Sequence, residues 1–277
     1  MKPAGTVLAL AVTAVSLAAG AWSQPCPVTG ISCERVTTVD PETWYPLCVG
    51  TKWTYRNTHA MAAVGSQVVR TRWLSSEEVV SRTPCGGSVV VRIEVTPSAI
   101  ERDYPPGLEA ATREWFEKDV GVPQTRGLLV RGSAIYRLAP ASWRDPCESL
   151  TQERLRQIDA SQPEFYFPLE DGAMWSDRQR EDLDYSELCA ASRGEVPMPN
   201  PGFYYWWVEG RKDIDVPWRH GLGAWHLALY TLGGAPHLWF VRNVGVVKER
   251  FSHSGSLWET SSELLRFRRG PECGRQK

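Results

Sequence analysis

Hydrophobic and polar residues alternate along most of the chain beyond residue 50, which is the period expected of half-buried β-strands. Each such stretch contains β-branched or aromatic residues and ends at residues typical of turns. We expect strands at Lys52 to Thr58, Gln67 to Leu74, Ser88 to Thr96, Leu128 to Leu138 (with a turn at Arg131-Gly132-Ser133), Phe203 to Val216, Ala224 to Leu232, His237 to Val241, Val246 to Phe251 and Leu257 to Phe267. About ten strands at short spacing predict a mainly β fold, a curved antiparallel sheet or half-barrel.

One or two short helices are expected to interrupt this sheet. The segment from Leu108 to Lys118 fits a helix, although Glu114-Trp115-Phe116 could equally belong to a strand. The segment from Glu148 to Ala160 places Leu155 and Ile158 on one face, as an amphipathic helix would.

The phrase P-L-x2-G-x2-W occurs twice, from Pro46 to Trp53 and from Pro168 to Trp175. Proline fixes the entry, leucine plugs the edge of a core, glycine permits a tight turn, and tryptophan begins a strand with its ring inward. Two copies indicate either a duplicated β unit or one start signal used twice in the same sheet. Neither copy carries catalytic groups, so we interpret the phrase as structural.

This phrase and a later pattern resemble exported bacterial proteins of unknown function. The later pattern comprises Asp213-Ile214-Asp215, Val216-Pro217, Trp239-Phe240, Gly245-Val246-Val247-Lys248 and Glu263-Leu264-Leu265. The resemblance covers Tyr45 to Phe267 and implies export and a curved sheet distantly similar to the periplasmic lipoprotein-carrier half-barrel. It departs from the usual pattern at Trp218 to Gly223, which is longer than a V-P-x-G turn, and it transfers no catalytic residues.

The N-terminus has the pattern of a secretory signal peptide: Lys2, an apolar run from Val7 to Ala19, and Ala21-Trp22-Ser23 before Gln24. The run is shorter than the roughly 20 residues that cross a bilayer, and no later segment is a spanning candidate. We expect a signal peptide at 1–23, a flexible segment at 24–41, one β-rich domain at 42–269 and a disordered tail at 270–277. The mature protein is then periplasmic or extracellular.

Cysteines in an exported chain are expected to form disulfides. After cleavage the chain holds Cys26, Cys33, Cys48, Cys85, Cys147, Cys189 and Cys273. They form at most three bridges, and the sequence does not fix the pairing. Cys26 and Cys33 could close a small loop, and Cys147 and Cys189 could staple the helical insert. A zinc site is disfavoured because paired C-x2-C or Cys/His spacings are absent.

Composition and motifs exclude several functions. Lysine and arginine number 31 against 32 aspartates and glutamates, so the basic excess of a nucleic-acid-binding protein is missing. The sequence lacks the nucleophile elbow, the H-E-x-x-H motif and the glycine-rich phosphate-binding loops. We therefore assign no catalytic residue and no cofactor, and we expect a monomer that is a binding protein rather than an enzyme.

Two clusters leave other chemistry open. His220, His226 and His237 could bring imidazoles together across strands, but the predicted face of His226 offers no further ligand, so we expect no metal site. The acids between Asp177 and Glu187, together with Asp213 and Asp215, could serve a hydrolase that acts on glycan or ester substrates. A solvated, salt-bridged face is the simpler explanation of these acids.

Tryptophan is unusually frequent, with 13 residues, and Phe203 to Trp207 places rings on both faces of one strand. Such rings could form a core covered on both sides, line an apolar groove for a lipid or other hydrophobic small molecule, or stack on sugars. A flat exposed patch would instead indicate a protein-interaction module. We choose the groove as the functional hypothesis. Its predicted ligand-binding residues are Tyr205, Trp207, Trp225, Trp239 and Trp258.

The signal-peptide prediction is tested by the N-terminus of the exported protein. Intact-mass measurement is expected to give a chain that begins at Gln24. A chain that retains Lys2, or one that carries lipid on Cys26, would contradict the predicted cleavage.

Overall fold

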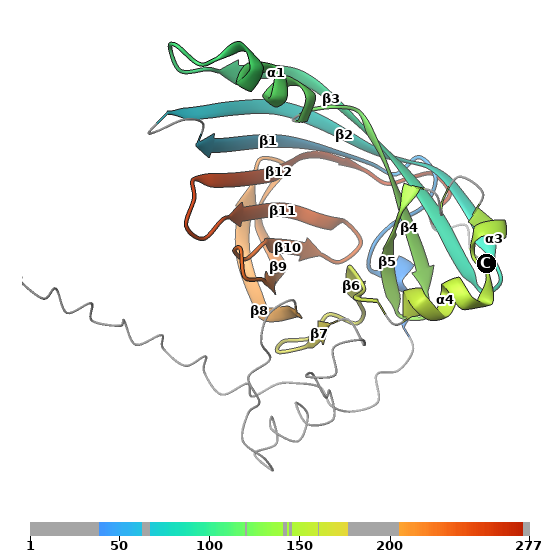
Figure 1. Ribbon diagram of the computed structural model, residues 1–277. Helices are drawn as coiled ribbons and strands as arrows, with labels where there is room; N and C mark the ends of the chain where they lie inside the picture. Colours follow the sequence, from blue (N-terminus) through green and yellow to red (C-terminus); the bar gives the residue numbers. More distant parts are fainter. Residues whose placement is uncertain are drawn as a thin grey trace, which may run out of the picture.

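The computed structural model describes residues 39–62, 67–119, 121–140, 143, 146–159, 161–176 and 205–273. These residues form one twelve-stranded antiparallel sheet that curves round on itself (Figure 1). Its strands are β1 Lys52–Ala62, β2 Val68–Cys85, β3 Ser88–Asp103, β4 Gln124–Arg131, β5 Ala134–Leu138, β6 Phe165–Tyr166, β7 Met174–Ser176, β8 Tyr205–Val216, β9 Arg219–Tyr230, β10 His237–Val241, β11 Gly245–Ser252 and β12 Trp258–Arg268. The predicted curved antiparallel sheet is confirmed. The two additional strands, β6 and β7, are too short to show an alternating pattern.

The sheet consists of two consecutive meanders, β1–β6 and β7–β12, which join where β1 pairs with β12. The two copies of P-L-x2-G-x2-W lead into β1 and β7, the first strand of each meander. This arrangement is the one that a duplicated β unit predicts. β6 and β7 form the two edges of the sheet. The Trp175 indole crosses between them, since its Nε1 donates to the Pro163 carbonyl at 3.0 Å.

Both copies of the phrase make the same backbone contacts. Gly50 and Gly172 each adopt φ +81°, a conformation that glycine tolerates and other residues avoid. The Gly50 amide donates to the Val79 carbonyl at 2.9 Å, and the Gly172 amide donates to the Val208 carbonyl at 2.8 Å. Each valine returns a hydrogen bond to the residue after the glycine. The tryptophan of each copy is buried in the same core, as the sequence predicted.

Residues 44–47, which we call the plug, enter the curved sheet ahead of β1. Trp44, Tyr45 and Leu47 are all buried in the main core. The Trp44 ring lies 4.9 Å from Trp225, and the Tyr45 ring lies 5.5 Å from Trp53. Burying a side chain of this size contributes roughly 1.5–3 kcal/mol. The plug therefore belongs to the structural core even though it lies outside every strand.

Helices cover parts of the sheet (Figure 1). α3 (Pro146–Ser149) lies against β2, and α4 (Gln152–Asp159) covers β4 and β5, where Leu155 and Ile158 share a buried cluster with Leu129 and Tyr136. The helix predicted from 148 to 160 is thus two short helices. α1 (Ala110–Asp119) confirms the helical alternative for its segment. None of the helices within the described residues has the length and hydrophobicity of a membrane-spanning segment.

Two disulfides lie within the described residues, Cys48–Cys273 and Cys85–Cys147. The predicted Cys147–Cys189 pairing is wrong, because α3 packs on β2 and brings Cys147 beside Cys85. The predicted Cys26–Cys33 loop, the signal peptide and Cys189 lie outside the described residues.

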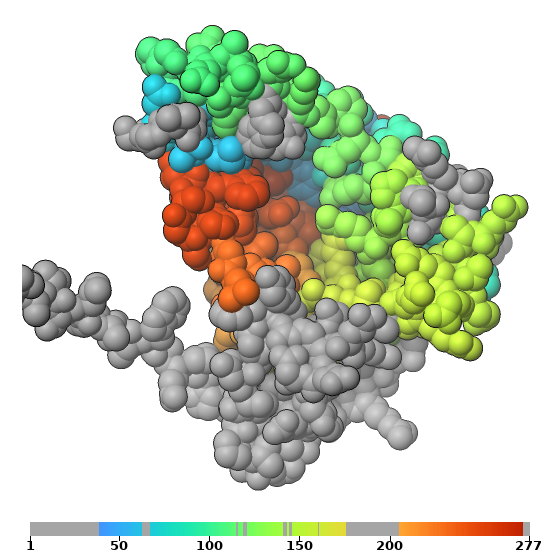
Figure 2. Space-filling model, viewed as in Figure 1, coloured from blue at the N-terminus to red at the C-terminus, as the bar shows by residue number. Residues whose placement is uncertain are grey.

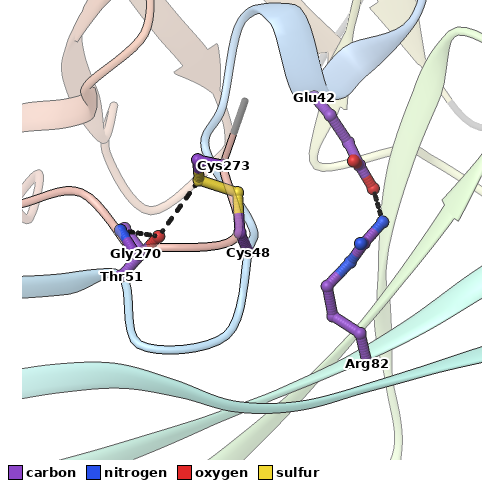
Figure 3. Close-up of a disulfide and its surroundings, with 6 residues drawn as sticks. All are labelled: Glu42, Cys48, Thr51, Arg82, Gly270 and Cys273. Atoms are coloured by element: carbon purple, nitrogen blue, oxygen red, sulfur yellow. Dashed lines mark hydrogen bonds and ion pairs between the residues drawn. A yellow bond between two sulfur atoms is a disulfide. The ribbon is translucent and has the colours of Figure 1, made fainter. Parts of the chain in front are cut away.

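The first disulfide ties the C-terminal segment to the entrance of β1. Thr51 accepts a hydrogen bond from the Gly270 amide at 3.0 Å, and its hydroxyl lies 3.6 Å from the Cys273 sulfur (Figure 3). Nearby, Glu42 forms an ion pair with Arg82 of β2 (Figure 3). This disulfide and the Thr51 contact attach Gly270 and Cys273 to the segment that precedes β1.

The contact between the plug and β11 yields a prediction with a matched control. A Cβ atom at Gly245, where φ is +99°, would lie 2.4 Å from the Tyr45 ring, whereas one at Gly255, where φ is +91°, would meet nothing within 4 Å. Both alanine substitutions strain the backbone, but only Gly245→Ala also clashes. We expect Gly245→Ala to lower the free energy of unfolding in urea by about 1–3 kcal/mol more than Gly255→Ala. Equal losses would show that Tyr45 does not pack on β11.

Candidate functional site

A cavity of about 530 Å³ remains inside the curved sheet, above the plug. Figure 2 shows the surface hollowed between the orange-to-red strands and the green segment that includes β4. Inward-facing residues of both meanders line it, and Tyr45 of the plug forms part of its wall. The volume falls within the roughly 300–1,000 Å³ of small-molecule sites. The interior is therefore neither fully open nor fully filled.

One wall of the cavity is apolar. β8, β9, β10 and β11 contribute Trp206, Leu229, Leu238 and Val246 to it. Trp206 and Leu238 are almost completely buried, because their outer edges pack into the main core. These four residues come from four neighbouring strands, one from each, and together form a continuous apolar surface on one side of the sheet.

The facing wall carries charge. Glu77 of β2 forms an ion pair with Arg126 of β4, and Arg137 of β5 donates two hydrogen bonds to Glu164, at 2.9 and 3.0 Å. Burial disfavours the charged form of Arg126, but Glu77, Glu164 and two tyrosines together more than offset this cost, and the pKa of Arg126 is raised. The hydrogen bonds that Glu164 accepts likewise raise the pKa of Arg137. Both guanidinium groups are therefore held charged and oriented.

Glu249 of β11 adds a third carboxylate to the cavity. Its side chain is accessible to water and yet enclosed by protein, as expected for a group that faces an internal cavity. Burial raises its pKa, and the attraction of Arg126 only partly opposes that shift. The cavity thus combines an apolar wall with two ion pairs and one additional acid.

The five predicted ligand-binding residues do not line this cavity. Trp225 lies in the core beneath it, against the plug. Tyr205, Trp207 and Trp239 occupy the opposite, outer face of β8–β10, where both β8 residues pack on Tyr230. Trp258, at the start of β12, is 43% exposed and stacks on His253. Of the five predicted residues, Tyr205, Trp207 and Trp239 share the outer face of the sheet. A role of the five in ligand binding stays a prediction.

The predicted carboxylates and histidines within the described residues also lie away from the cavity. Asp213 and Asp215 are exposed near the β8–β9 turn, where Asp215 accepts a hydrogen bond from the Gly221 amide at 2.8 Å. The acids from Asp177 to Glu187 lie outside the described residues. His220 lies 3.4 Å from Asp215, away from the cavity. His226 and His237 do meet, on the outer face, with their nearest ring nitrogens 3.0 Å apart.

Sequence reasoning missed the charged residues of the cavity. Glu77, Arg126 and Glu249 sit in strands where a polar residue is normally assigned to solvent. Their inward orientation depends on the closure of the sheet, which the local pattern does not contain. The structure shows that Glu77 and Trp206 are equivalent, because each precedes by two residues a valine that bonds to a copy of the repeated phrase, but the sequence alone does not pair these valines.

Comparisons with known proteins give distant likenesses. No protein-family model matches the chain, and no curated protein matches it. A predicted lipoprotein from Parabacteroides distasonis and a predicted exported protein with a YmcC-like fold from Bacteroides fragilis are each 12% identical, with TM-scores of 0.33 and 0.35; each likeness covers 82% of this chain and 99% of the other. A LolA superfamily protein from Nitrosomonas europaea is 11% identical, with a TM-score of 0.18 and coverage of 83% and 89%. At these values, function has to be inferred from the cavity itself.

The raised pKa of Glu249 predicts a pH-dependent effect of Glu249→Gln. The pKa of Glu249 in the folded protein lies above its ordinary value near 4.5, so ionising Glu249 lowers the free energy of unfolding. This loss develops as the pH rises from the ordinary pKa through the raised pKa of the folded state. We expect the variant to gain stability over the natural protein at pH 7 and to gain less at pH 4, measured by urea unfolding. Glu101→Gln, an exposed acid of β3 away from the cavity, is the control and should show no such gain. Destabilisation at pH 7 would contradict the enclosure of Glu249.

Proposed function

We propose that this protein is a non-enzymatic binding protein of the cell envelope that holds a lipid or other amphipathic small molecule in the cavity of its curved sheet. The observation that carries the proposal is the division of the cavity into an apolar wall and a charged wall. A ligand with a hydrocarbon part would replace water against Trp206, Leu229 and Leu238, which is favourable by roughly 25 cal/mol per Å² of apolar surface.

The charged wall supports an amphipathic rather than a purely apolar ligand. An enclosed ion pair is costly unless its hydrogen-bonding capacity is satisfied by partners, and the Arg126 and Arg137 side chains both line the cavity. A polar headgroup beside Arg126, Arg137 and Glu249 would supply such partners.

Export belongs to the same proposal. The signal-peptide pattern before Gln24 predicts a periplasmic or extracellular protein. Disulfides such as Cys48–Cys273 and Cys85–Cys147 persist in that oxidising environment. A protein of this kind would meet amphipathic molecules of the envelope without entering the membrane.

Binding is tested by two equivalent substitutions at neighbouring positions of β9. Leu229 faces the cavity and Tyr230 faces the opposite side of the sheet. Leu229→Trp would place a larger side chain in the cavity and narrow it, whereas Tyr230→Trp would leave it unchanged. We expect a hydrophobic fluorescent dye such as 1-N-phenylnaphthylamine to bind the natural protein and Tyr230→Trp alike, and to bind Leu229→Trp at least tenfold more weakly. Lipid should also be found by mass spectrometry in protein taken from a membrane-free extract.

A third variant, Trp207→Ala, tests the binding residues predicted from sequence, because Trp207 lies on the outer face. Loss of dye binding in Trp207→Ala, with Leu229→Trp unaffected, would move the site to the outer face. Failure of the natural protein to bind either dye or lipid would overturn the proposed function.

A further inference from the structure

A second polar cluster lies on the outer face of the sheet, separate from the cavity. Glu209 of β8, His226 of β9 and His237 of β10 each offer one ligand atom, and these atoms lie within 4.8 Å of one another. His226 is 5% exposed, and the other two are half-buried. Two imidazoles and a carboxylate form one of the ligand sets that bind zinc at open sites.

A β-bulge brings Glu209 into this cluster. Val208 pairs with Leu227 and Gly210 pairs with His226, so Glu209 is the extra residue on β8. Gly210 adopts φ +115°, a backbone conformation that L side chains rarely adopt. Bulges re-aim single side chains and are frequent beside functional sites. Here the bulge places the Glu209 carboxylate 2.7 Å from Nδ1 of His226.

The two imidazoles are close to the separation that a shared metal ion requires. Nε2 of His226 lies 3.0 Å from Nδ1 of His237. Two nitrogens that each lie about 2.0–2.1 Å from a tetrahedral zinc ion are roughly 3.4 Å apart. An adjustment of a few tenths of an ångström would therefore give this pair of nitrogens the separation of two zinc ligands. The Glu209 carboxylate, which contacts the other ring nitrogen of His226, would have to turn toward Nε2 to join them.

Neighbouring side chains hold the potential ligands in place. The Trp239 ring stacks on His226 at 4.7 Å and within 12° of parallel, which fixes the imidazole plane. The Tyr230 hydroxyl donates to Oε1 of Glu209 at 3.0 Å and leaves the other carboxylate oxygen facing His226. In metal sites, side chains that hydrogen-bond to the ligands or stack on them fix the orientation of those ligands.

Lys212 already supplies a positive charge to this cluster. Its ammonium lies 2.6 Å from Nδ1 of His226 and 3.2 Å from the Glu209 carboxylate. The Lys212 side chain is 49% exposed, so it can turn into solvent without disturbing the sheet. A divalent ion would compete with this ammonium for the same carboxylate.

We propose that Nε2 of His226, Nδ1 of His237 and the Glu209 carboxylate form a binding site for a divalent transition-metal ion of the zinc type, which draws the carboxylate away from Nδ1 of His226 and from the Lys212 ammonium. Imidazole and carboxylate ligands suit Zn²⁺, and the solvent-facing side of the cluster leaves a coordination position for water. The site lies on the opposite face of the sheet from the cavity, so it stands independently of the proposed ligand binding.

The test is isothermal titration of the purified, chelator-treated protein with ZnCl₂. We expect one ion per chain in the natural protein and at least tenfold weaker binding in His237→Ala. Lys212→Met should bind zinc several-fold more tightly, a gain that misfolding cannot produce. His220→Ala is the matched control, because His220 lies on the same strand beside a single carboxylate, Asp215. Its affinity should equal that of the natural protein.

Cobalt replaces zinc in a second measurement that separates this site from cysteine. The proposed ligands should give weak visible d–d bands, whereas thiolate ligands would add strong charge-transfer absorption in the near ultraviolet. Thiolate absorption, equal zinc affinity in His237→Ala and the natural protein, or no gain in Lys212→Met would each overturn the proposal. Dye binding in the cavity should be unchanged in His237→Ala.

Discussion

The inner face of a twelve-stranded curved sheet encloses more space than its own side chains fill, and this constraint shapes the rest of the molecule. About eight strands enclose an interior that side chains just fill. Here the plug occupies one end of the interior, with Trp44, Tyr45 and Leu47 packed among core aromatic rings. The other end retains the cavity. Without the plug, the strand residues around it would face water on the inner side of the sheet.

The two meanders give the cavity its two different walls. The β1–β6 meander supplies Glu77, Arg126 and Arg137, whereas the β7–β12 meander supplies most of the apolar wall, including Trp206. Glu77 and Trp206 hold equivalent positions relative to the two copies of the repeated phrase. The β1–β6 meander thus carries both ion pairs of the lining, and the β7–β12 meander carries most of its apolar residues together with Glu249.

Much of the fold could be predicted because strands, turns and the repeated phrase are local. The alternation even assigned Trp206 and Trp207 to opposite faces correctly. It could not say which face closes round the cavity, because that depends on the pairing of β1 with β12, far apart in the sequence. The Cys85–Cys147 bridge was missed for a similar reason, since the packing of α3 on β2 is not a sequence pattern. The bulge at Glu209 could not be predicted from sequence, because it is defined by the pairing register of β8 and β9 and not by the alternation of hydrophobic and polar residues.

The most direct measurement of the central claim is a crystal structure of the protein soaked with a bromine-tagged alkyl amphiphile, located by the anomalous signal of bromine. The account predicts bromine density inside the curved sheet, between Leu229 and Leu238, with the polar end of the molecule toward Arg126 and Glu249. Bromine density on the outer face beside Trp207 and Trp239, or a cavity occupied by rearranged side chains, would contradict it.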